Sequence, residues 1–136
     1  PEASKRAVSS QFALIAGLLD GVETFLEIAP GDCRLSFEVA KHVPRVIGVD
    51  ISDQSGTVTR RPANFELVVY DGYTLGIPEK SVDLAFSYQF LEHLHPDDVL
   101  LHFQMIKRVL KPGGAYVFAT PHRFSGPHDI SAHFSD

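Results

Sequence analysis

The chain has 136 residues with a formal net charge of −5, and 44% of its residues are hydrophobic, which suits one domain with a hydrophobic core. Because affinity for nucleic-acid phosphates comes from clustered Lys and Arg, the acidic balance argues against a nucleic-acid partner. No apolar run reaches the roughly 20 residues that a membrane helix needs, so no membrane partner is expected.

The first half of the chain alternates between predicted helices and strands. Apolar residues at helical spacing predict a helix over residues 5–19, which Asp20-Gly21 ends. Residues 22–28 predict a first strand and residues 32–42 a helix behind it. Residues 46–49 predict a buried second strand that ends on Asp50. The polar segment 51–62 predicts a poor helix or an irregular crossover.

The second half continues this alternation. Residues 64–70 and 82–87 predict the third and fourth strands, and a helix is expected from Pro96 to residue 110. The Lys-Pro-Gly-Gly sequence at 111–114 ends that helix, and residues 115–120 predict the fifth strand. No clear element is predicted for residues 121–136. The pattern predicts an α/β fold, with a doubly wound, mostly parallel Rossmann-like sheet, helices on both faces and a stop after strand five.

The turn after the first strand carries small residues at every second position, Ala29, Gly31 and Cys33, and an acid, Glu27, precedes them. A dinucleotide-binding fingerprint needs a small third residue for close helix–strand packing, and here that position is Arg34. A nicotinamide-dependent oxidoreductase is therefore disfavoured. A phosphate-binding loop would need Gly-Lys-Ser/Thr, which is absent.

Acidic residues follow the next two predicted strands. Asp50 lies about 20 residues beyond the small-residue turn, a spacing that suits a carboxylate bound to a ribose diol. Asp71 ends the third strand, where it is placed to accept a hydrogen bond from an adenine amino group. Each acid alone is equally well explained as a turn or cap residue, as Asp32 is. Together with the small-residue turn, they favour a nucleoside that is cationic and lacks phosphate.

Three segments carry motifs in a fixed order, FLEIAPGDCRLSFEVA, LVVYDGYTLGIPEKSVDLAFSYQFLEHLHPDD and IKRVLKPGGAYVFATP. Together they resemble the class I S-adenosylmethionine-dependent methyltransferases, in the small-molecule, methyltransferase type 11-like group. The resemblance implies one domain over residues 1–136 and methyl transfer from S-adenosylmethionine to a small-molecule or glycan-like acceptor, with S-adenosylhomocysteine as product. The alternative is a non-catalytic binding or scaffold module that retains this fold.

The resemblance also implies which residues bind the cofactor, at the carboxyl ends of the strands. Glu27 would face the methionine amino group, Asp50 would bind the ribose hydroxyls, and Asp71 would accept from the adenine amino group. The family usually has glycine at the positions of Ala29 and Cys33. The full implied set is Glu27, Ala29, Pro30, Gly31, Asp50, Ile51, Asp71, Gly72, Ser87 and Tyr88.

The catalytic residue stays open. His93 is a candidate for a base or a substrate contact, although a role in capping or packing the turn before Pro96 is favoured. Cys33 is disfavoured as a nucleophile, and as the single cysteine it indicates a reducing, cytoplasmic location. A metal site is not expected, because no zinc-ligand spacing joins the paired histidines His93 and His95 to His122, His128 or His133.

The family's sheet usually continues with two strands beyond strand five. The chain starts with Pro1 rather than Met and ends early for that pattern. We therefore expect either a fragment or a bare strand-five edge that another chain or the C-terminal tail must cover, and cover by another chain would give a homodimer through that edge.

Overall fold

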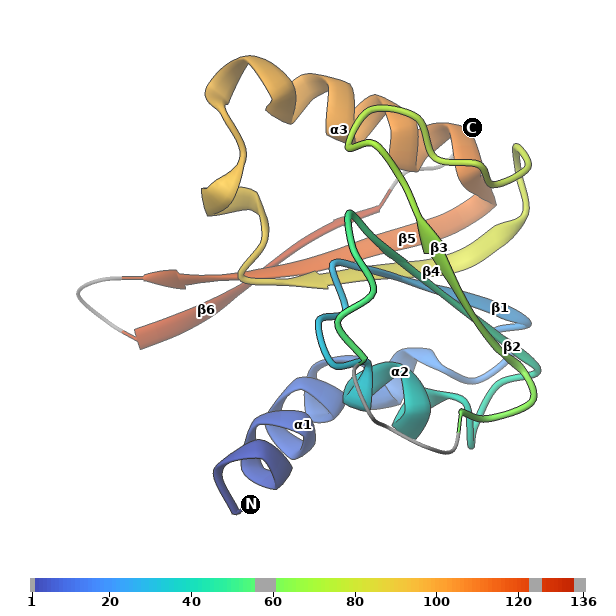
Figure 1. The fold of residues 1–136 in the computed structure, drawn as a ribbon, viewed down its shortest axis with the longest axis vertical. Coiled ribbons are helices and arrows are strands. Elements are labelled where there is room, and N and C mark those ends of the chain that lie inside the picture. The colour runs from blue at the N-terminus through green and yellow to red at the C-terminus, as the bar shows by residue number, and fades with distance from the viewer. Residues whose placement is uncertain (1, 56–60, 123–125, 134–136) are drawn as a thin grey trace.

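The computed structural model describes residues 2–55, 61–122 and 126–133, which form one sheet with helices on both faces (Figure 1). In chain order the elements are α1 (Glu2–Ile15), the 3₁₀ turn η1 (Ala16–Leu18), β1 (Thr24–Ile28), α2 (Arg34–Val39), β2 (Arg45–Asp50), β3 (Phe65–Val69), β4 (Val82–Tyr88), the 3₁₀ turn η2 (Leu91–His93), α3 (Pro96–Val109), β5 (Leu110–His122) and β6 (Gly126–His133).

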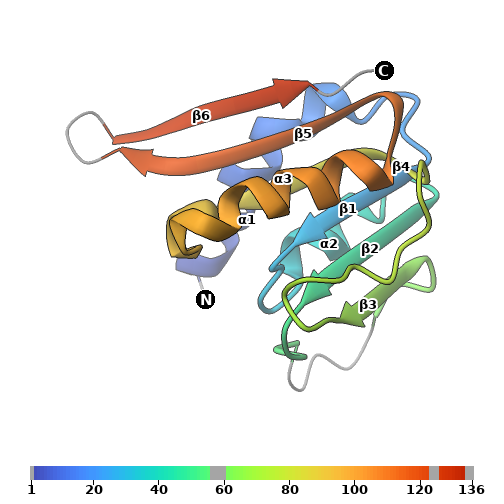
Figure 2. The same cartoon turned by 90° about the horizontal axis from the view of Figure 1, so that it is seen from above.

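The strands of the described sheet follow the order β3-β2-β1-β4-β5-β6, as Figure 2 shows from above. The pairs from β3 to β5 are parallel, and β6 runs antiparallel to β5. The predicted doubly wound, mostly parallel fold is confirmed. Chain order reverses between β1 and β4, and ligands of such sheets bind outside the carboxyl ends of the strands at that point.

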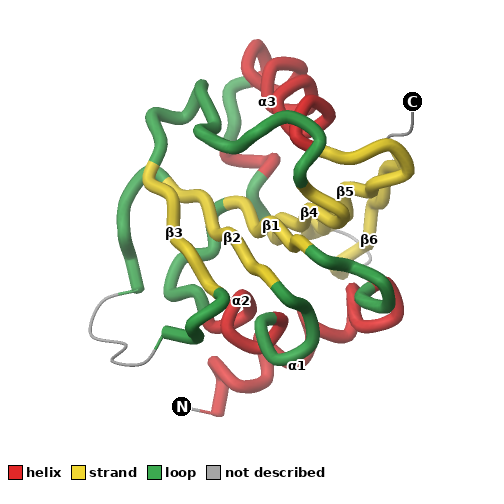
Figure 3. Tube along the Cα trace, turned by 90° about the vertical axis from the view of Figure 1, so that its right-hand side faces the viewer, coloured by secondary structure: helices red, strands yellow, loops and turns green. Residues whose placement is uncertain are grey.

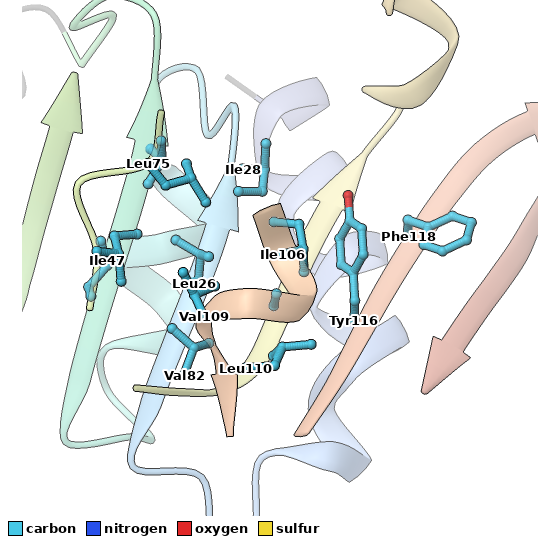
Figure 4. Close-up of a cluster of buried hydrophobic side chains, with 13 residues drawn as sticks. Leu26, Ile28, Ile47, Leu75, Val82, Ile106, Val109, Leu110, Tyr116 and Phe118 are labelled. Carbon is cyan, nitrogen blue, oxygen red and sulfur yellow. The ribbon is translucent and has the colours of Figure 1, made fainter. Parts of the chain in front are cut away.

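Helices α1 and α2 cover one face of the sheet and α3 covers the other (Figure 3). Successive residues of a strand point to opposite faces, so Phe25 and Leu26 of β1 enter different cores, and both have no exposed surface. Figure 4 shows the α3-side core, where Ile106 lies beside Tyr116 and Leu26 belongs to the same cluster. Burial on both faces explains why the strands read as near-continuous apolar runs.

A single carboxylate ties the amino ends of the strands together. Oδ2 of Asp83 accepts hydrogen bonds from the backbone N–H groups of Glu23 and Thr24, at 3.0 and 2.9 Å. Lys111 Nζ donates to the same oxygen at 3.2 Å. This cluster joins the start of β1 to β4 and to the segment that follows α3.

The sheet extends one strand further than the sequence predicts. The sequence predicts no clear element for residues 121–136, but β6 pairs with β5 from Ala115↔His133 to His122↔Gly126. The segment forms its strand through backbone pairing, which a sequence rich in Pro, Gly, Ser and His does not signal. Because β5 has neighbours on both sides, its edge is not bare but is covered by the C-terminal segment, one of the two expected covers. The homodimer through that edge stays a prediction.

Smaller differences concern where elements begin and end. Helix α2 has six residues, Arg34–Val39, and is shorter than the predicted 32–42. Strand β5 includes residues 111–114, which bulge out of the ladder because Val82 pairs with Leu110 and Leu84 with Ala115. In the predicted crossover, residues 51–55 and 61–62 contain no helix or strand, and residues 56–60 lie outside the described part. No helix in the described chain is long and apolar enough to span a membrane.

Candidate cofactor site at the carboxyl edge

The turn between β1 and α2 places every second residue in the left-handed region. The φ angles are +55° at Ala29, +60° at Gly31 and +68° at Cys33. Only glycine adopts this conformation without a steric penalty, which for other L-residues is about 1–2 kcal/mol. The alternating small residues therefore have a conformational cause, and Ala29 and Cys33 carry strain that glycine would relieve.

Backbone and packing contacts hold this strained turn. Ala29 N donates to Val49 O at 2.7 Å, and Cys33 N donates to Pro30 O at 2.9 Å. Pro30 is buried against β2, since a Cβ built on Gly48 would approach its Cγ to 3.1 Å. Pro30 therefore anchors the turn on the sheet, whereas Ala29 is exposed at the edge.

Asp50 links the turn to the end of β2. Its Oδ2 accepts from Gly31 N at 3.2 Å, and its Oδ1 accepts from Ile51 N at 2.8 Å. The residue is 5% exposed, whereas Ile51 beside it is 65% exposed. The structure thus brings together a buried carboxylate and an unusually exposed apolar side chain, next to the left-handed turn.

Glu27 is a buried acid beneath the same turn. It is 4% exposed, and Ser36 Oγ donates to its Oε1 at 2.6 Å, which joins β1 to α2. Desolvation by burial raises the pKa of Glu27 from 4.5 to about 7, and the negative charges of Asp32 and Asp50 act in the same direction. Near neutral pH, the carboxyl is therefore poised between its protonated and ionised forms.

Asp71 has a turn role of its own. Its Oδ1 accepts from the backbone N–H groups of Tyr73 and Thr74 at 2.8 and 2.7 Å. These bonds, to Thr74 and then Tyr73, lower the pKa of the carboxyl. Gly72 has a φ of +93°, so the chain bends sharply directly after β3. Asp71 is exposed at the same sheet edge as Asp50.

The end of β4 holds one predicted side chain away from solvent. Ser87 is 1% exposed, and its Oγ is hydrogen-bonded to Tyr116 Oη at 2.7 Å. Tyr88 is half-buried and packs against the core on the α1 side. Gln89, which the sequence did not single out, has a φ of +54° and donates its backbone N–H to Ala119 O at 2.7 Å. Gln89 stands out only by its left-handed backbone, which the sequence does not reveal for a residue other than glycine.

The histidines separate into exposed and buried positions. His93 is exposed in η2, and the cap of α3 is His95, whose Nδ1 accepts from Asp97 N at 3.1 Å. The capping role proposed for His93 therefore falls to His95. His102 was missed because it reads as part of an ordinary amphipathic helix. It is 3% exposed, and its Nε2 is hydrogen-bonded to Tyr116 Oη at 2.8 Å.

Neither the metal nor the nucleophile alternative gains support from the described side chains. Within the described part of the chain, no three His, Cys, Asp or Glu residues gather as metal ligands do. The side chains of His122, His128 and His133 lie outside the described part. Cys33 is buried, and desolvation raises the pKa of its thiol to about 12, so the reactive thiolate is scarce at neutral pH.

The edge has room for a ligand. A Cβ built on Gly31 or Gly72 would have no described heavy atom within 4 Å, apart from immediate chain neighbours. Ala29 and Ile51 are exposed beside this space. The edge therefore offers carboxylates, an apolar side chain and backbone that a ligand can approach closely. This combination fits a nucleoside that carries positive charge.

The methyltransferase domain family matches residues 26–118, a segment that includes the turn and the ends of β1 to β4. This chain belongs to that family. A search among curated proteins found no match. Several solved structures share the fold of this methyltransferase domain.

The PH0226 protein from Pyrococcus horikoshii aligns at 23% identity with a TM-score of 0.79, over 89% of this chain and 59% of that protein. A SAM-dependent methyltransferase from Methanosarcina mazei aligns at 24% identity with a TM-score of 0.71, over 82% and 58%. The phosphoethanolamine N-methyltransferase 1 of Haemonchus contortus, solved with phosphoethanolamine and S-adenosylhomocysteine, aligns at 20% identity with a TM-score of 0.66, over 72% and 22%. The chain thus spans at most 59% of the length of these proteins.

Proposed function

We propose that this methyltransferase domain, treated as one unit over residues 1–136, binds S-adenosylmethionine at the carboxyl edge of its sheet. It would transfer the methyl group to a small-molecule or glycan-like acceptor. The observation that carries the proposal is the Asp50 carboxylate, which is buried between the left-handed turn and the exposed Ile51. The S-adenosylhomocysteine bound to the Haemonchus contortus relative supports the choice of cofactor.

The geometry of this edge supports the contacts proposed for the nucleoside part of the cofactor. Asp50 would bind the ribose hydroxyls, and Ile51 would pack its exposed side chain on the adenine ring. Asp71 would accept a hydrogen bond from the adenine amino group, and Gly72 would contact the ligand through its backbone. These assignments are supported by the exposure of Ile51 and by the open space above Gly31 and Gly72.

The methionine end would lie over the β1–α2 turn. Gly31 lets backbone and ligand approach closely, while Ala29 adds one methyl group at the edge. Glu27 would face the amino group of methionine. A cation beside a carboxyl of pKa about 7 favours the ionised form, so cofactor binding would release part of a proton from Glu27. Ser87 is buried, so we assign it the support of β4 and Tyr88 the contact with the cofactor side.

S-adenosylmethionine supplies a methyl group on a sulfonium, so the protein has mainly to bind, orient and exclude water. A base is needed only where the acceptor loses a proton in the reaction. His93 is exposed close to the end of β4 and stays the candidate for that role. We further propose a cytoplasmic protein that does not act on nucleic acid, in keeping with its net charge of −5.

One alternative has an observation in its favour. The strained Ala29 and Cys33 stand where the family usually has glycine, as expected for a module that keeps the fold and has lost transfer. Such a module would bind the cofactor weakly or not at all. Incubation with S-adenosylmethionine labelled on its methyl group and a mixture of small-molecule acceptors separates the two, because weak or absent binding together with no label transfer favours the module.

Calorimetric titration with S-adenosylmethionine tests the binding itself. The wild-type domain should bind one equivalent, and Asp50→Asn should weaken binding at least about 10-fold because a charged hydrogen-bond acceptor is lost. Glu66→Gln is the control, since Glu66 is an exposed acid on β3 paired with Arg45. Absence of heat from wild type, or equal affinity for Asp50→Asn and Glu66→Gln, would overturn the proposal.

A further inference from the structure

Three polar side chains form a continuous chain inside the α3-side core. Ser87 of β4 is hydrogen-bonded to Tyr116 of β5 at 2.7 Å, and Tyr116 is hydrogen-bonded to His102 of α3 at 2.8 Å. Their exposed fractions are 1%, 0% and 3%. Figure 4 shows the Tyr116 hydroxyl between apolar neighbours, with Ile106 on one side and Phe118 on the other.

Packing alone does not explain these residues. Buried polar groups are unfavourable unless they are hydrogen-bonded, and apolar residues of similar size would fill the same space without that requirement. Burial lowers the pKa of His102 to about 4, so its imidazole is neutral at physiological pH. The Tyr116 phenol has one proton, so it donates to one partner and accepts from the other. Removing this hydroxyl would leave both partners unpaired.

One end of this hydrogen-bonded chain lies next to the proposed site, because Ser87 pairs with Ile28, the last residue of β1 before the left-handed turn. Ser87 precedes Tyr88 and the left-handed Gln89, where β4 leaves the sheet. Strand β5 holds this exit twice, through the bond from Gln89 N to Ala119 O at 2.7 Å and through the Tyr116 hydroxyl. A residue other than glycine stays in the left-handed region only where several surrounding contacts fix its backbone conformation.

The other end reaches the neighbouring part of the same edge. His102 lines a cavity of about 180 Å³, together with Tyr70, Asp71 and Gly72 at the end of β3. Aromatic contacts fix the His102 ring as well, because its centroid lies 5.1 Å from that of Phe90. The hydrogen-bonded side chains of His102, Tyr116 and Ser87 therefore connect the end of β3, through α3 and β5, to the end of β4.

We propose that Tyr116 and His102 are positioning residues, which hold Ser87 and with it the exit of β4 in the conformation that the cofactor site requires. The predicted effect on ligand binding rests on the proposed function, whereas the predicted effect on the conformation of the β4 end does not. Tyr116 is fully buried away from the cofactor edge, and His102 reaches that edge only at the cavity beside Asp71 and Gly72. Their effect on binding passes through Ser87 and the left-handed Gln89.

The test compares four single variants, and one double variant made from two of them, with a matched packing control. Ser87→Ala and Tyr116→Phe remove one hydroxyl each, His102→Leu removes the imidazole, and His102→Gln restores a polar group near the position of Nε2. Ile106→Val is the control, because Ile106 is fully buried in the same core and makes no polar contact through its side chain. Two quantities are measured on the folded proteins, the Kd for S-adenosylhomocysteine and hydrogen exchange of residues 86–90 without ligand.

We expect Tyr116→Phe, Ser87→Ala and His102→Leu to raise the Kd about fivefold and to speed exchange at residues 86–90. The Ser87→Ala/Tyr116→Phe double variant should be no weaker than Tyr116→Phe alone, and His102→Gln should recover most of the affinity. Ile106→Val should change neither quantity.

Two outcomes contradict different claims. If wild type does not bind S-adenosylhomocysteine, the proposed function fails. Hydrogen exchange at residues 86–90 then still decides whether the hydrogen-bonded side chains hold the end of β4 in place. If wild type binds and the three hydroxyl or imidazole variants match Ile106→Val in both affinity and exchange, the positioning role is overturned.

Discussion

The two edges of the sheet are built on different principles. At the amino edge, Asp83 receives two backbone N–H groups and the Lys111 ammonium, so its charge is used within the fold. At the carboxyl edge, Glu27 is buried with a raised pKa, and Ala29, Cys33 and Gln89 sit in left-handed backbone. Strain and buried acids concentrate where ligands bind, whereas satisfied charges serve stability.

The contrast is not absolute, because Lys80, ahead of β4, is also left-handed, with a φ of +52°. Its surroundings are different, since it is exposed and its N–H donates to Arg108 O at 3.0 Å. What distinguishes the carboxyl edge is the combination of strained residues with buried acids and open space. Four changes test that contrast, from the largest expected effect to the smallest.

Asp83→Ala should be the most destabilising change. It leaves Glu23 N, Thr24 N and Lys111 without their shared acceptor, in a site where the Asp83 side chain is 24% exposed. We expect the free energy of unfolding to fall by roughly 3–4 kcal/mol, measured by urea denaturation. Affinity for S-adenosylmethionine should not change in the folded fraction. An unaltered denaturation midpoint would remove the amino edge from the comparison.

Glu27→Gln should change how stability depends on pH. The folded pKa of about 7 lies above the unfolded value of 4.5, so the folded state binds the proton more tightly. This stabilisation is complete below pH 4.5 and is lost as pH rises through 7, a fall of about 3 kcal/mol. Urea denaturation at pH 5 and pH 8 should show this loss in wild type but not in Glu27→Gln. Glu66→Gln serves as the exposed control, and a wild-type slope in both variants would contradict the assignment.

Exchanging residues in the left-handed turn should give effects of opposite sign. Ala29→Gly relieves strain and should stabilise the fold by roughly 0.5–1 kcal/mol. Gly31→Ala introduces the same strain, and since its Cβ would meet no described atom within 4 Å, the cost of about 1 kcal/mol is conformational. Thermal denaturation of both variants tests the sign. Two changes of the same sign would show that φ does not control stability here.

Cys33 should resist modification while the protein is folded. Its buried thiol has a pKa of about 12, so alkylation by iodoacetamide at pH 8 should be far slower than in urea-unfolded protein. Mass spectrometry follows the single adduct, because the chain has one cysteine. Equal rates in the two states would show that the carboxyl edge is open around this residue.

Much of the fold was predictable because its signals are local. Buried parallel strands appear in the sequence as apolar runs. The start of α3 is indicated by Pro96 and by the acidic residues of its first turn. Strand β6 escaped because its pairing with β5 depends on backbone hydrogen bonds rather than on an apolar face pattern. The expected cover of the β5 edge by the C-terminal tail is confirmed, although the sequence does not show that the tail does this as a strand.

The site was predictable in its acids and small residues, but not in how they are held. Spacing indicated Asp50 and Asp71, yet it did not reveal that both carboxylates already accept backbone hydrogen bonds. His102 and Tyr116 lie on different elements and meet only in three dimensions, so no linear motif joins them. Which L-residues adopt positive φ likewise depends on tertiary contacts.

Amide chemical-shift mapping with S-adenosylhomocysteine compares the two edges in one measurement. We predict large shifts at Gly31, Ile51 and Gly72, and none at Glu23 and Thr24 beside Asp83. That result would place the ligand on the strained edge. Shifts confined to the Asp83 edge, or none at saturating ligand, would contradict the claim that the carboxyl edge is the cofactor site.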